Sequence, residues 1–85
     1  MKKKSELLFT REFLRRLRRL DKQVQIRILR ELKVLEGNPF CGKRLLGRLS
    51  GLFSFRVGEF RVIYSLSGNK VIVRTVGHRR EVYGR

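Results

Sequence analysis

Three consecutive stretches in the second half of the chain alternate apolar and polar residues, and they constrain the fold more than any other feature. They cover residues 52–57, 60–67 and 70–76 and are rich in Val, Ile, Phe and Tyr. A period of two is typical of half-buried β-strands. The stretches are separated by Gly58-Glu59 and Gly68-Asn69, which suit two-residue hairpin turns. The pattern therefore predicts three antiparallel strands joined by two hairpins.

The two turns also predict the register of the strands, and with it the two faces of the sheet. The first turn pairs Val57 with Phe60, Arg56 with Arg61, Phe55 with Val62 and Phe53 with Tyr64. The second pairs Leu66 with Val71, Tyr64 with Val73, Ile63 with Arg74 and Arg61 with Val76. Because side chains alternate across a sheet, one face is expected to be a core of Phe53, Phe55, Val57, Phe60, Val62, Tyr64, Leu66, Val71 and Val73. The other face is expected to carry Ser54, Arg56, Arg61, Ile63, Ser65, Ile72, Arg74 and Val76, with His78 beside them.

The first half of the chain has helical periodicity. Thr10 is expected to cap a helix over 11–20, and Asp21 a second helix over 22–36 that ends at Gly37-Asn38-Pro39. The apolar stripes of the two helices are Phe13, Leu14, Leu17 and Leu20, then Val24, Ile28, Leu29, Leu32 and Leu35.

These helices complete the predicted architecture. Residues 3–9 suit a short first strand and residues 38–51 a long loop. We expect a single α+β domain over residues 1–85, with two N-terminal helices packed on one face of a small, mainly antiparallel β-sheet.

The charge of the chain indicates a polyanionic partner. Its 22 Lys and Arg residues outnumber 7 Asp and Glu residues, which gives a formal net charge of +15. Such a field attracts nucleic acid, an anionic membrane or an acidic protein. With 85 residues, the chain is too small to enclose a deep pocket for a metabolite as well as a core.

Other features narrow the setting. One Cys, one His and scattered carboxylates argue against a metal site, and we expect no metal and no cofactor. No apolar run approaches the roughly 20 residues that span a bilayer, and Met1-Lys2-Lys3-Lys4 lacks the apolar stretch of a signal peptide. We expect a cytoplasmic protein with no membrane partner.

The predicted cationic face suggests where a phosphate binds. Arg56 and Arg61 are expected to be direct cross-strand neighbours, an arrangement that destabilises a sheet unless something relieves the repulsion. Guanidinium groups suit phosphate through bidentate geometry, although the two arginines can also splay into solvent or reach a distant carboxylate. Further candidates for phosphate contacts are Arg74 and Arg80 and, in the long basic loop, Lys43, Arg44 and Arg48.

The end of the chain holds two candidates for proton transfer. His78 is the single histidine and titrates near neutral pH. Tyr83 titrates near 10 when unperturbed, and neighbouring arginines would favour its phenolate. A lone histidine is equally well explained as structural.

Three segments together resemble the RelE/ParE superfamily of type II toxins. They are Leu49-Ser50-Gly51, the strand pair Phe53-Ser54-Phe55-Arg56-Val57-Gly58-Glu59-Phe60-Arg61-Val62-Ile63-Tyr64, and Val76-Gly77-His78-Arg79-Arg80-Glu81-Val82-Tyr83. The resemblance implies one of two activities. The RelE branch consists of ribosome-dependent mRNA interferases that use no metal, and the ParE branch poisons DNA gyrase.

The resemblance to the RelE branch also implies roles for single residues. The 2′-OH of the mRNA attacks the adjacent phosphate, the 5′-oxygen leaves and a 2′,3′-cyclic phosphate forms. Arg61 matches the arginine that contacts the reacting phosphate, Arg79 the arginine that stabilises charge or protonates the leaving group, and Tyr83 the proposed base. Since arginine stays protonated, Arg56, Arg61 and Arg79 are better suited to clamp the phosphate, with Tyr83 and His78 competing as base and acid.

The expected function is therefore an mRNA-cleaving toxin that acts on ribosome-bound mRNA and pairs with an acidic, RelB-like antitoxin. A ParE-like gyrase inhibitor and a non-catalytic RNA- or ribosome-binding module remain alternatives. The loss of mRNA cleavage in the catalytic variants would distinguish the first from the others.

Overall fold

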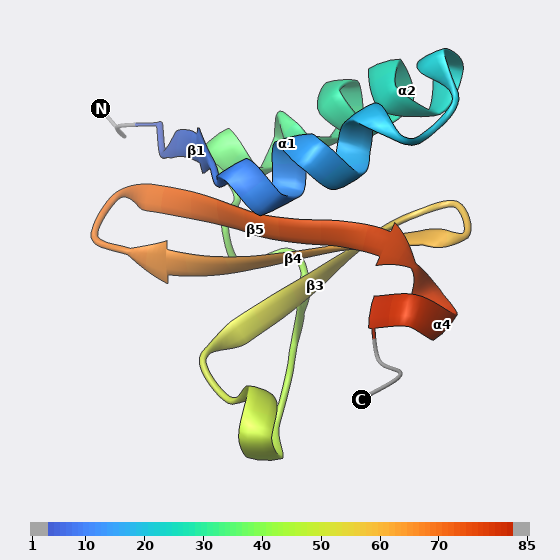
Figure 1. The fold of residues 1–85 in the computed structure, drawn as a ribbon. Helices are drawn as coiled ribbons and strands as arrows, with labels where there is room; N and C mark the ends of the chain where they lie inside the picture. The colour runs from blue at the N-terminus through green and yellow to red at the C-terminus, as the bar shows by residue number, and fades with distance from the viewer. Residues whose placement is uncertain (1–3, 83–85) are drawn as a thin grey trace.

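A five-stranded mixed sheet forms the centre of the computed structural model, which describes residues 4–82 (Figure 1). The strands are β1 (Glu6–Phe9), β2 (Lys43–Arg44), β3 (Leu52–Val57), β4 (Phe60–Ser67) and β5 (Lys70–His78). Their order is β1-β5-β4-β3-β2; β1 runs parallel to β5 and all other neighbours are antiparallel. The predicted α+β class and the mainly antiparallel sheet are confirmed.

Both hairpin turns occur where the sequence predicts them. Gly58 (φ 60°) and Gly68 (φ 61°) adopt the left-handed conformation that glycine accommodates without strain. All four predicted pairs between β3 and β4 are present, including Arg56 opposite Arg61. A two-residue turn leaves no freedom in register, which explains why this hairpin is predictable.

The helices are α1 (Arg11–Arg18), α2 (Lys22–Leu32) and the short α3 (Val34–Gly37). The Thr10 hydroxyl accepts a hydrogen bond from the Phe13 N–H (3.1 Å), so the predicted cap is confirmed. Asp21 occupies the second cap position without a side-chain cap bond. The expected helix over 22–36 is interrupted at Lys33.

The apolar stripes and the long loop also differ in detail from the prediction. Leu14 and Leu29 are 37% and 39% exposed, because α1 and α2 present narrower faces to the sheet than the sequence stripes suggest. The expected loop over 38–51 contains the two residues of β2 and a short 3-10 helix, η1 (Gly47–Leu49).

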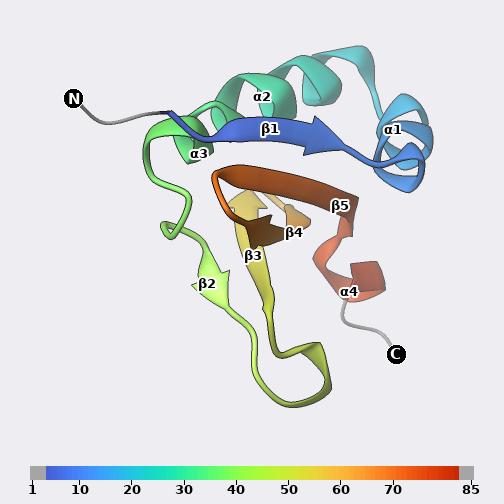
Figure 2. The ribbon, with the colours of Figure 1, turned by 90° about the vertical axis from the view of Figure 1, so that its left-hand side faces the viewer.

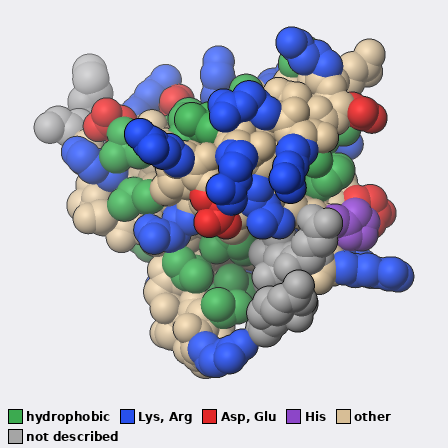
Figure 3. Space-filling model, viewed as in Figure 1, with side chains coloured by type: hydrophobic (Ala, Val, Ile, Leu, Met, Phe, Trp, Pro, Cys, Tyr) green, Lys and Arg blue, Asp and Glu red, His purple; other side chains and the backbone are tan. Residues whose placement is uncertain are grey.

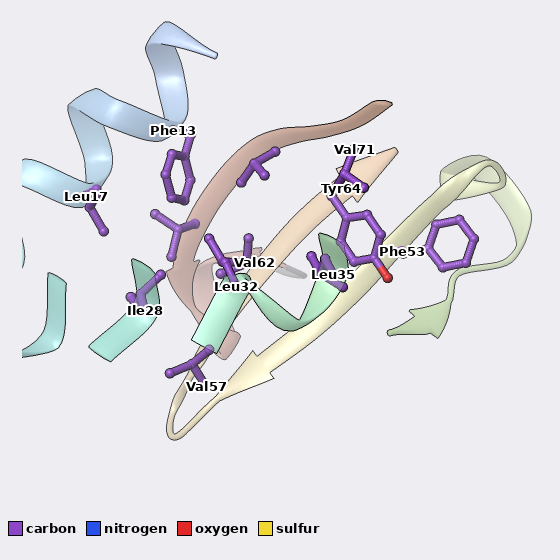
Figure 4. Packing of buried hydrophobic residues seen from close by; sticks show 12 residues of the cluster. Phe13, Leu17, Ile28, Leu32, Leu35, Phe53, Val57, Val62, Tyr64 and Val71 are labelled. Atoms are coloured by element: carbon purple, nitrogen blue, oxygen red, sulfur yellow. The ribbon is translucent and has the colours of Figure 1, made fainter. Parts of the chain in front are cut away.

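The core lies between the helices and one face of the sheet. In Figures 1 and 2, α1 and α2 lie along one side of the sheet. The segment that contains β2 and η1 lies on the other side, below the sheet in both views, as does α4 (Arg79–Val82). Figure 4 shows how the buried side chains from both layers meet. The cluster consists of Phe13, Leu17, Ile28, Leu32, Leu35, Phe53, Val57, Val62, Tyr64, Val71, Val73 and Val76.

The register of β5 against β4 corrects the sequence analysis. Tyr64 lies opposite Val73 as predicted, but Ile63 lies opposite Thr75 and Arg61 opposite Gly77, because β5 holds one extra residue, Arg74, at a bulge. From there on the faces of β5 are exchanged. Val76, expected on the cationic face, is therefore buried in the core opposite Val62.

Helix α1 provides the physical reason for the bulge. The Thr10 hydroxyl donates to the Arg74 carbonyl (2.7 Å), and Arg16 Nε donates to the Val76 carbonyl (2.8 Å). These side chains satisfy backbone acceptors in the irregular part of the ladder. Because the donors lie some 60 residues away in sequence, strand periodicity alone does not indicate them.

Candidate nucleic-acid site

The Arg56–Arg61 pair borders a hollow at the sheet side that the helices leave free. The hollow has a volume of about 630 Å³ and is lined by Cys41, Gly42, Lys43, Leu45, Ser54, Phe55, Arg56 and Arg61. We call it the cationic hollow. Three of its lining residues are basic, and none of the described ones is acidic. Such a site attracts anions and offers them several charged donors.

Arg61 has an unusual environment within this site. Its Nη1 atom is buried and has no hydrogen-bond partner among the described residues. Its neighbour on β5 is Gly77, which has no side chain to offer. A buried charged donor without a partner costs folding free energy, and an anion in the hollow would supply the missing acceptor. Arg56 extends toward the hairpin turn, where its Nε donates to the Gly58 carbonyl (3.4 Å).

Lys43 and Arg44 are adjacent in β2 but lie in different surroundings. Lys43 is paired with Ser54 and lines the cationic hollow. Arg44 is paired with Phe53, and its guanidinium lies 5.7 Å from the centre of that ring, in a cation–π contact. Alternation along β2 thus separates the two predicted phosphate contacts.

Two further predicted contacts lie apart from the hollow. Arg74, the bulge residue, lines a separate depression of about 260 Å³ with Thr10, Glu12, Leu52, Ile63 and Thr75. Arg48 is exposed in η1. The structure therefore gathers Lys43, Arg56 and Arg61 and leaves Arg44, Arg48 and Arg74 outside the lining.

His78 does not lie on the cationic face, where the sequence analysis expects it. Beyond the bulge it is paired with Phe60, whose ring it meets edge-on (6.1 Å between centroids). Its Nε2 lies 3.9 Å from Glu59 Oε1, and its Nδ1 accepts a hydrogen bond from the Arg80 N–H (3.4 Å). The register shift in β5 is the reason for this correction.

Helix α4 begins beside the β3–β4 turn. The Arg79 N–H donates to the Glu59 carbonyl (3.1 Å), which anchors the backbone of Arg79 to this turn, and Arg80 follows it in α4. Tyr83 lies outside the described residues. No group of three or more His, Cys, Asp or Glu side chains suited to a metal occurs in residues 4–82, and no helix in that range is long and apolar enough to cross a membrane.

Tyr64 contributes to the site in a way that sequence analysis missed. It is fully buried, as a core residue should be. Its hydroxyl donates to the Pro39 carbonyl (2.8 Å) and accepts from the Gly42 N–H (3.0 Å). Burial raises the pKa of this phenol above its ordinary value. The sequence offers one sign of this role: a core position is occupied by tyrosine, although phenylalanine would pack there equally well without a hydroxyl.

A second basic surface covers α1. Figure 3 shows many Lys and Arg side chains over the helical side of the molecule. The exposed ones in α1 and the residue that follows it are Arg11, Arg15, Arg18 and Arg19. The charge of the chain is therefore distributed over both layers.

Comparison with known families decides what kind of protein carries these features. Residues 7–83 match the family described as the ParE toxin of the type II toxin–antitoxin system parDE. The chain belongs to this family. It is thus a RelE/ParE superfamily toxin, and the resemblance in its strand and tail motifs is confirmed. A search of curated proteins gives no match.

Solved structures of RelE-type toxins share the fold of this ParE-family chain. The RelBE2 toxin–antitoxin complex of Mycobacterium tuberculosis is 28% identical with a TM-score of 0.79, covering 89% of this chain and 99% of that one. The archaeal RelE–RelB complex of Pyrococcus horikoshii is 23% identical with a TM-score of 0.76, covering 89% and 96%. A mutant of the Escherichia coli toxin RelE in the free state is 21% identical with a TM-score of 0.77, covering 95% and 92%.

Proposed function

We propose that this toxin is a ribosome-dependent, metal-independent mRNA endonuclease. The observation that carries the proposal is the cationic hollow, with Arg56 and Arg61 side by side and a buried Arg61 donor that lacks a partner. A phosphodiester in the hollow would accept from that donor. Charge develops on the phosphoryl oxygens during cleavage, so preplaced guanidinium groups lower the barrier.

The reaction follows from the 2′-OH of the RNA. A base removes its proton, the oxygen attacks the adjacent phosphorus, and the bond to the 5′-oxygen breaks. An acid returns a proton to that oxygen, which leaves a 2′,3′-cyclic phosphate. Arg56, Arg61 and Arg79 would hold the phosphate, while Tyr83 would act as base and His78 as acid, or the reverse.

The ribosome and an antitoxin are the proposed partners. The 2′-OH attacks in line only if the RNA is held in the required geometry, and the ribosome would hold the codon in that geometry. Two of the similar structures are complexes of RelE-type toxins with their antitoxins. By analogy, an acidic RelB-like antitoxin would bind the exposed arginines of α1. A cytoplasmic location follows from both partners.

Primer extension on mRNA in a translation extract tests this function. The wild-type toxin should produce ribosome-dependent cuts that Arg61→Ala and Tyr83→Phe abolish or reduce by about 10²-fold or more. Arg30→Ala, on the exposed surface of α2, is the matched control and should cut normally. A wild-type chain that leaves mRNA intact would refute the proposal.

Gyrase inhibition is the second candidate, because the matching family is that of ParE toxins. A supercoiling and DNA-cleavage assay with purified gyrase separates the two. Gyrase-dependent DNA breaks with intact mRNA would favour the ParE activity. Binding of RNA or ribosomes without cleavage of either nucleic acid would instead indicate a non-catalytic module.

A further inference from the structure

A buried hydroxyl beneath the cationic hollow holds the segment that forms one of its walls. The segment Pro39 to Arg44, which consists of the connection that follows α3 and the two residues of β2, supplies Cys41, Gly42 and Lys43 to the lining of the hollow. The Tyr64 hydroxyl meets this segment at two points, accepting from the Gly42 N–H (3.0 Å) and donating to the Pro39 carbonyl (2.8 Å). It thereby fills a gap in the backbone hydrogen bonding of an irregular segment.

The ring of Tyr64 is itself fixed by the core. It is fully buried and stacks on Phe53, with 5.1 Å between centroids and 15° between planes. Figure 4 shows the two rings at one end of the core cluster, with the Tyr64 oxygen at the outer end of its ring. The hydroxyl is therefore a rigid point to which the segment is attached.

Gly42, the residue that contacts the Tyr64 hydroxyl, is also closely packed. A Cβ added to Gly42 would lie 2.6 Å from the Tyr64 hydroxyl and 3.0 Å from the Ser54 carbonyl. Only a glycine lets the backbone approach so near. The next residue, Lys43, pairs with Ser54 and directs its charge to the hollow that Arg56 and Arg61 also line. The position of the Lys43 backbone thus depends on the contact between Gly42 and Tyr64.

We propose that Tyr64 is a positioning residue that sets Lys43 against the Arg56–Arg61 pair, so that the three cations receive one phosphate group of a nucleic acid. The ligand in this inference, a single-stranded RNA, is taken from the proposed function. The attachment of the segment to Tyr64 does not depend on that function. Tyr64 touches no substrate and acts through Gly42 and Lys43.

Other contacts keep the segment in place when the hydroxyl is removed. Phe40 meets the Phe53 ring edge-on at 6.0 Å, and Arg44 lies over the same ring. Tyr64→Phe therefore removes two hydrogen bonds and keeps the packing of the core. The expected result is a folded protein in which Lys43 is less well placed.

Binding of a fluorescein-labelled single-stranded RNA to the full chain measures the effect. Tyr64→Phe should weaken binding about three- to tenfold, since the contribution of the misplaced cation is lost. Lys43→Ala should weaken binding of the wild-type chain by a similar factor and have little further effect in the Tyr64→Phe background. Independent, multiplying effects of the two substitutions would overturn the proposal.

A core variant distinguishes positioning from general destabilisation. Ile28→Val removes one methylene from a buried α2 residue at the opposite end of the core (Figure 4). It should lower the free energy of unfolding and leave the effect of Lys43→Ala unchanged. If Ile28→Val also abolishes the effect of Lys43→Ala, Tyr64 acts only through stability. Should Tyr64→Phe not fold, Gly42→Ala displaces the same segment while retaining the hydroxyl.

Two probes do not depend on RNA and keep this inference separate from the proposed function. The Gly42 amide should exchange its hydrogen faster in Tyr64→Phe, and the exposed thiol of Cys41 should react at a changed rate with a disulfide reagent. If Arg61→Ala leaves RNA binding unaltered, the proposed function fails, and these two rates still decide whether Tyr64 holds the segment. If both rates in Tyr64→Phe equal those of the wild-type chain, Tyr64 does not hold the segment and the positioning role is refuted.

Discussion

Gly42 and Gly37 lie only five positions apart and should respond oppositely to the same substitution. A Cβ at Gly42 meets the Tyr64 hydroxyl and a backbone carbonyl, whereas nothing lies within 4 Å of a Cβ at Gly37. Gly42→Ala should therefore lower the free energy of unfolding by about 1–3 kcal/mol. Gly37→Ala should leave it unchanged or raise it by up to about 1 kcal/mol, because alanine restricts the unfolded chain. Urea unfolding of both variants tests this, and equal losses would contradict it.

The Tyr64 phenol should make stability depend on alkaline pH. Burial raises its pKa above the ordinary value of about 10. The folded chain therefore keeps the proton at pH values where the unfolded chain has released it, so the free energy of unfolding falls as pH rises above about 10. The loss continues until the pH passes the pKa of the folded state.

Comparison with Tyr64→Phe isolates this contribution. The stability advantage of the wild-type chain should shrink as the pH is raised from about 9 to 11. The pKa of the Cys41 thiol is also raised, because this exposed residue is still partly shielded from solvent, but the thiol is present in both chains. A difference in unfolding free energy that stays constant across this range would contradict the assignment.

At the scale of single residues, the predictable part of the site is what the first hairpin determines. Arg56 and Arg61 are neighbours because a two-residue turn at 58–59 allows one register. Lys43 joins them through β2, a two-residue strand too short to produce a periodic signal. The role of Tyr64 depends on a contact across 22 residues of sequence, which no local pattern reveals.

At the scale of elements, the features that the sequence did not predict lie where β1, α1 and β5 meet. Thr10 caps α1 and also donates to the bulged carbonyl of Arg74. The bulge exchanges the faces of the last part of β5, which buries Val76 and moves His78 to the side of Phe60. Strand periodicity predicts an unbroken ladder, because the donors that stabilise the interruption come from another element.

Substitution of Thr10 measures the coupling of these elements. Thr10→Ala removes both the cap and the bond to Arg74, and should lower the free energy of unfolding by about 1–2 kcal/mol. Thr10→Ser keeps a hydroxyl in the same place and should cost much less. Chemical denaturation of the two variants gives the comparison. If the serine chain is as unstable as the alanine chain, the hydroxyl is not the stabilising group.

At the scale of the whole molecule, a net charge of +15 makes affinity for a polyanion a poor guide to where it binds. Cations cover α1 as well as the cationic hollow, and either surface can bind RNA non-specifically. The number of phosphates neutralised is a better measure, because each contact to single-stranded RNA contributes about −0.7 to the slope of log affinity against log salt concentration.

The salt dependence of RNA binding should therefore identify the binding face. Between about 50 and 200 mM salt, Lys43→Ala and Arg56→Ala should each reduce the magnitude of the slope, and removal of all three cations that share one phosphate should reduce it by about 0.7. Arg30→Ala removes the same charge from the exposed side of α2 and should leave the slope unchanged. Anisotropy titrations with one labelled RNA give all the slopes. If Arg30→Ala lowers the slope as much as Arg56→Ala does, the RNA lies on the helices, and the cationic hollow is not its main site.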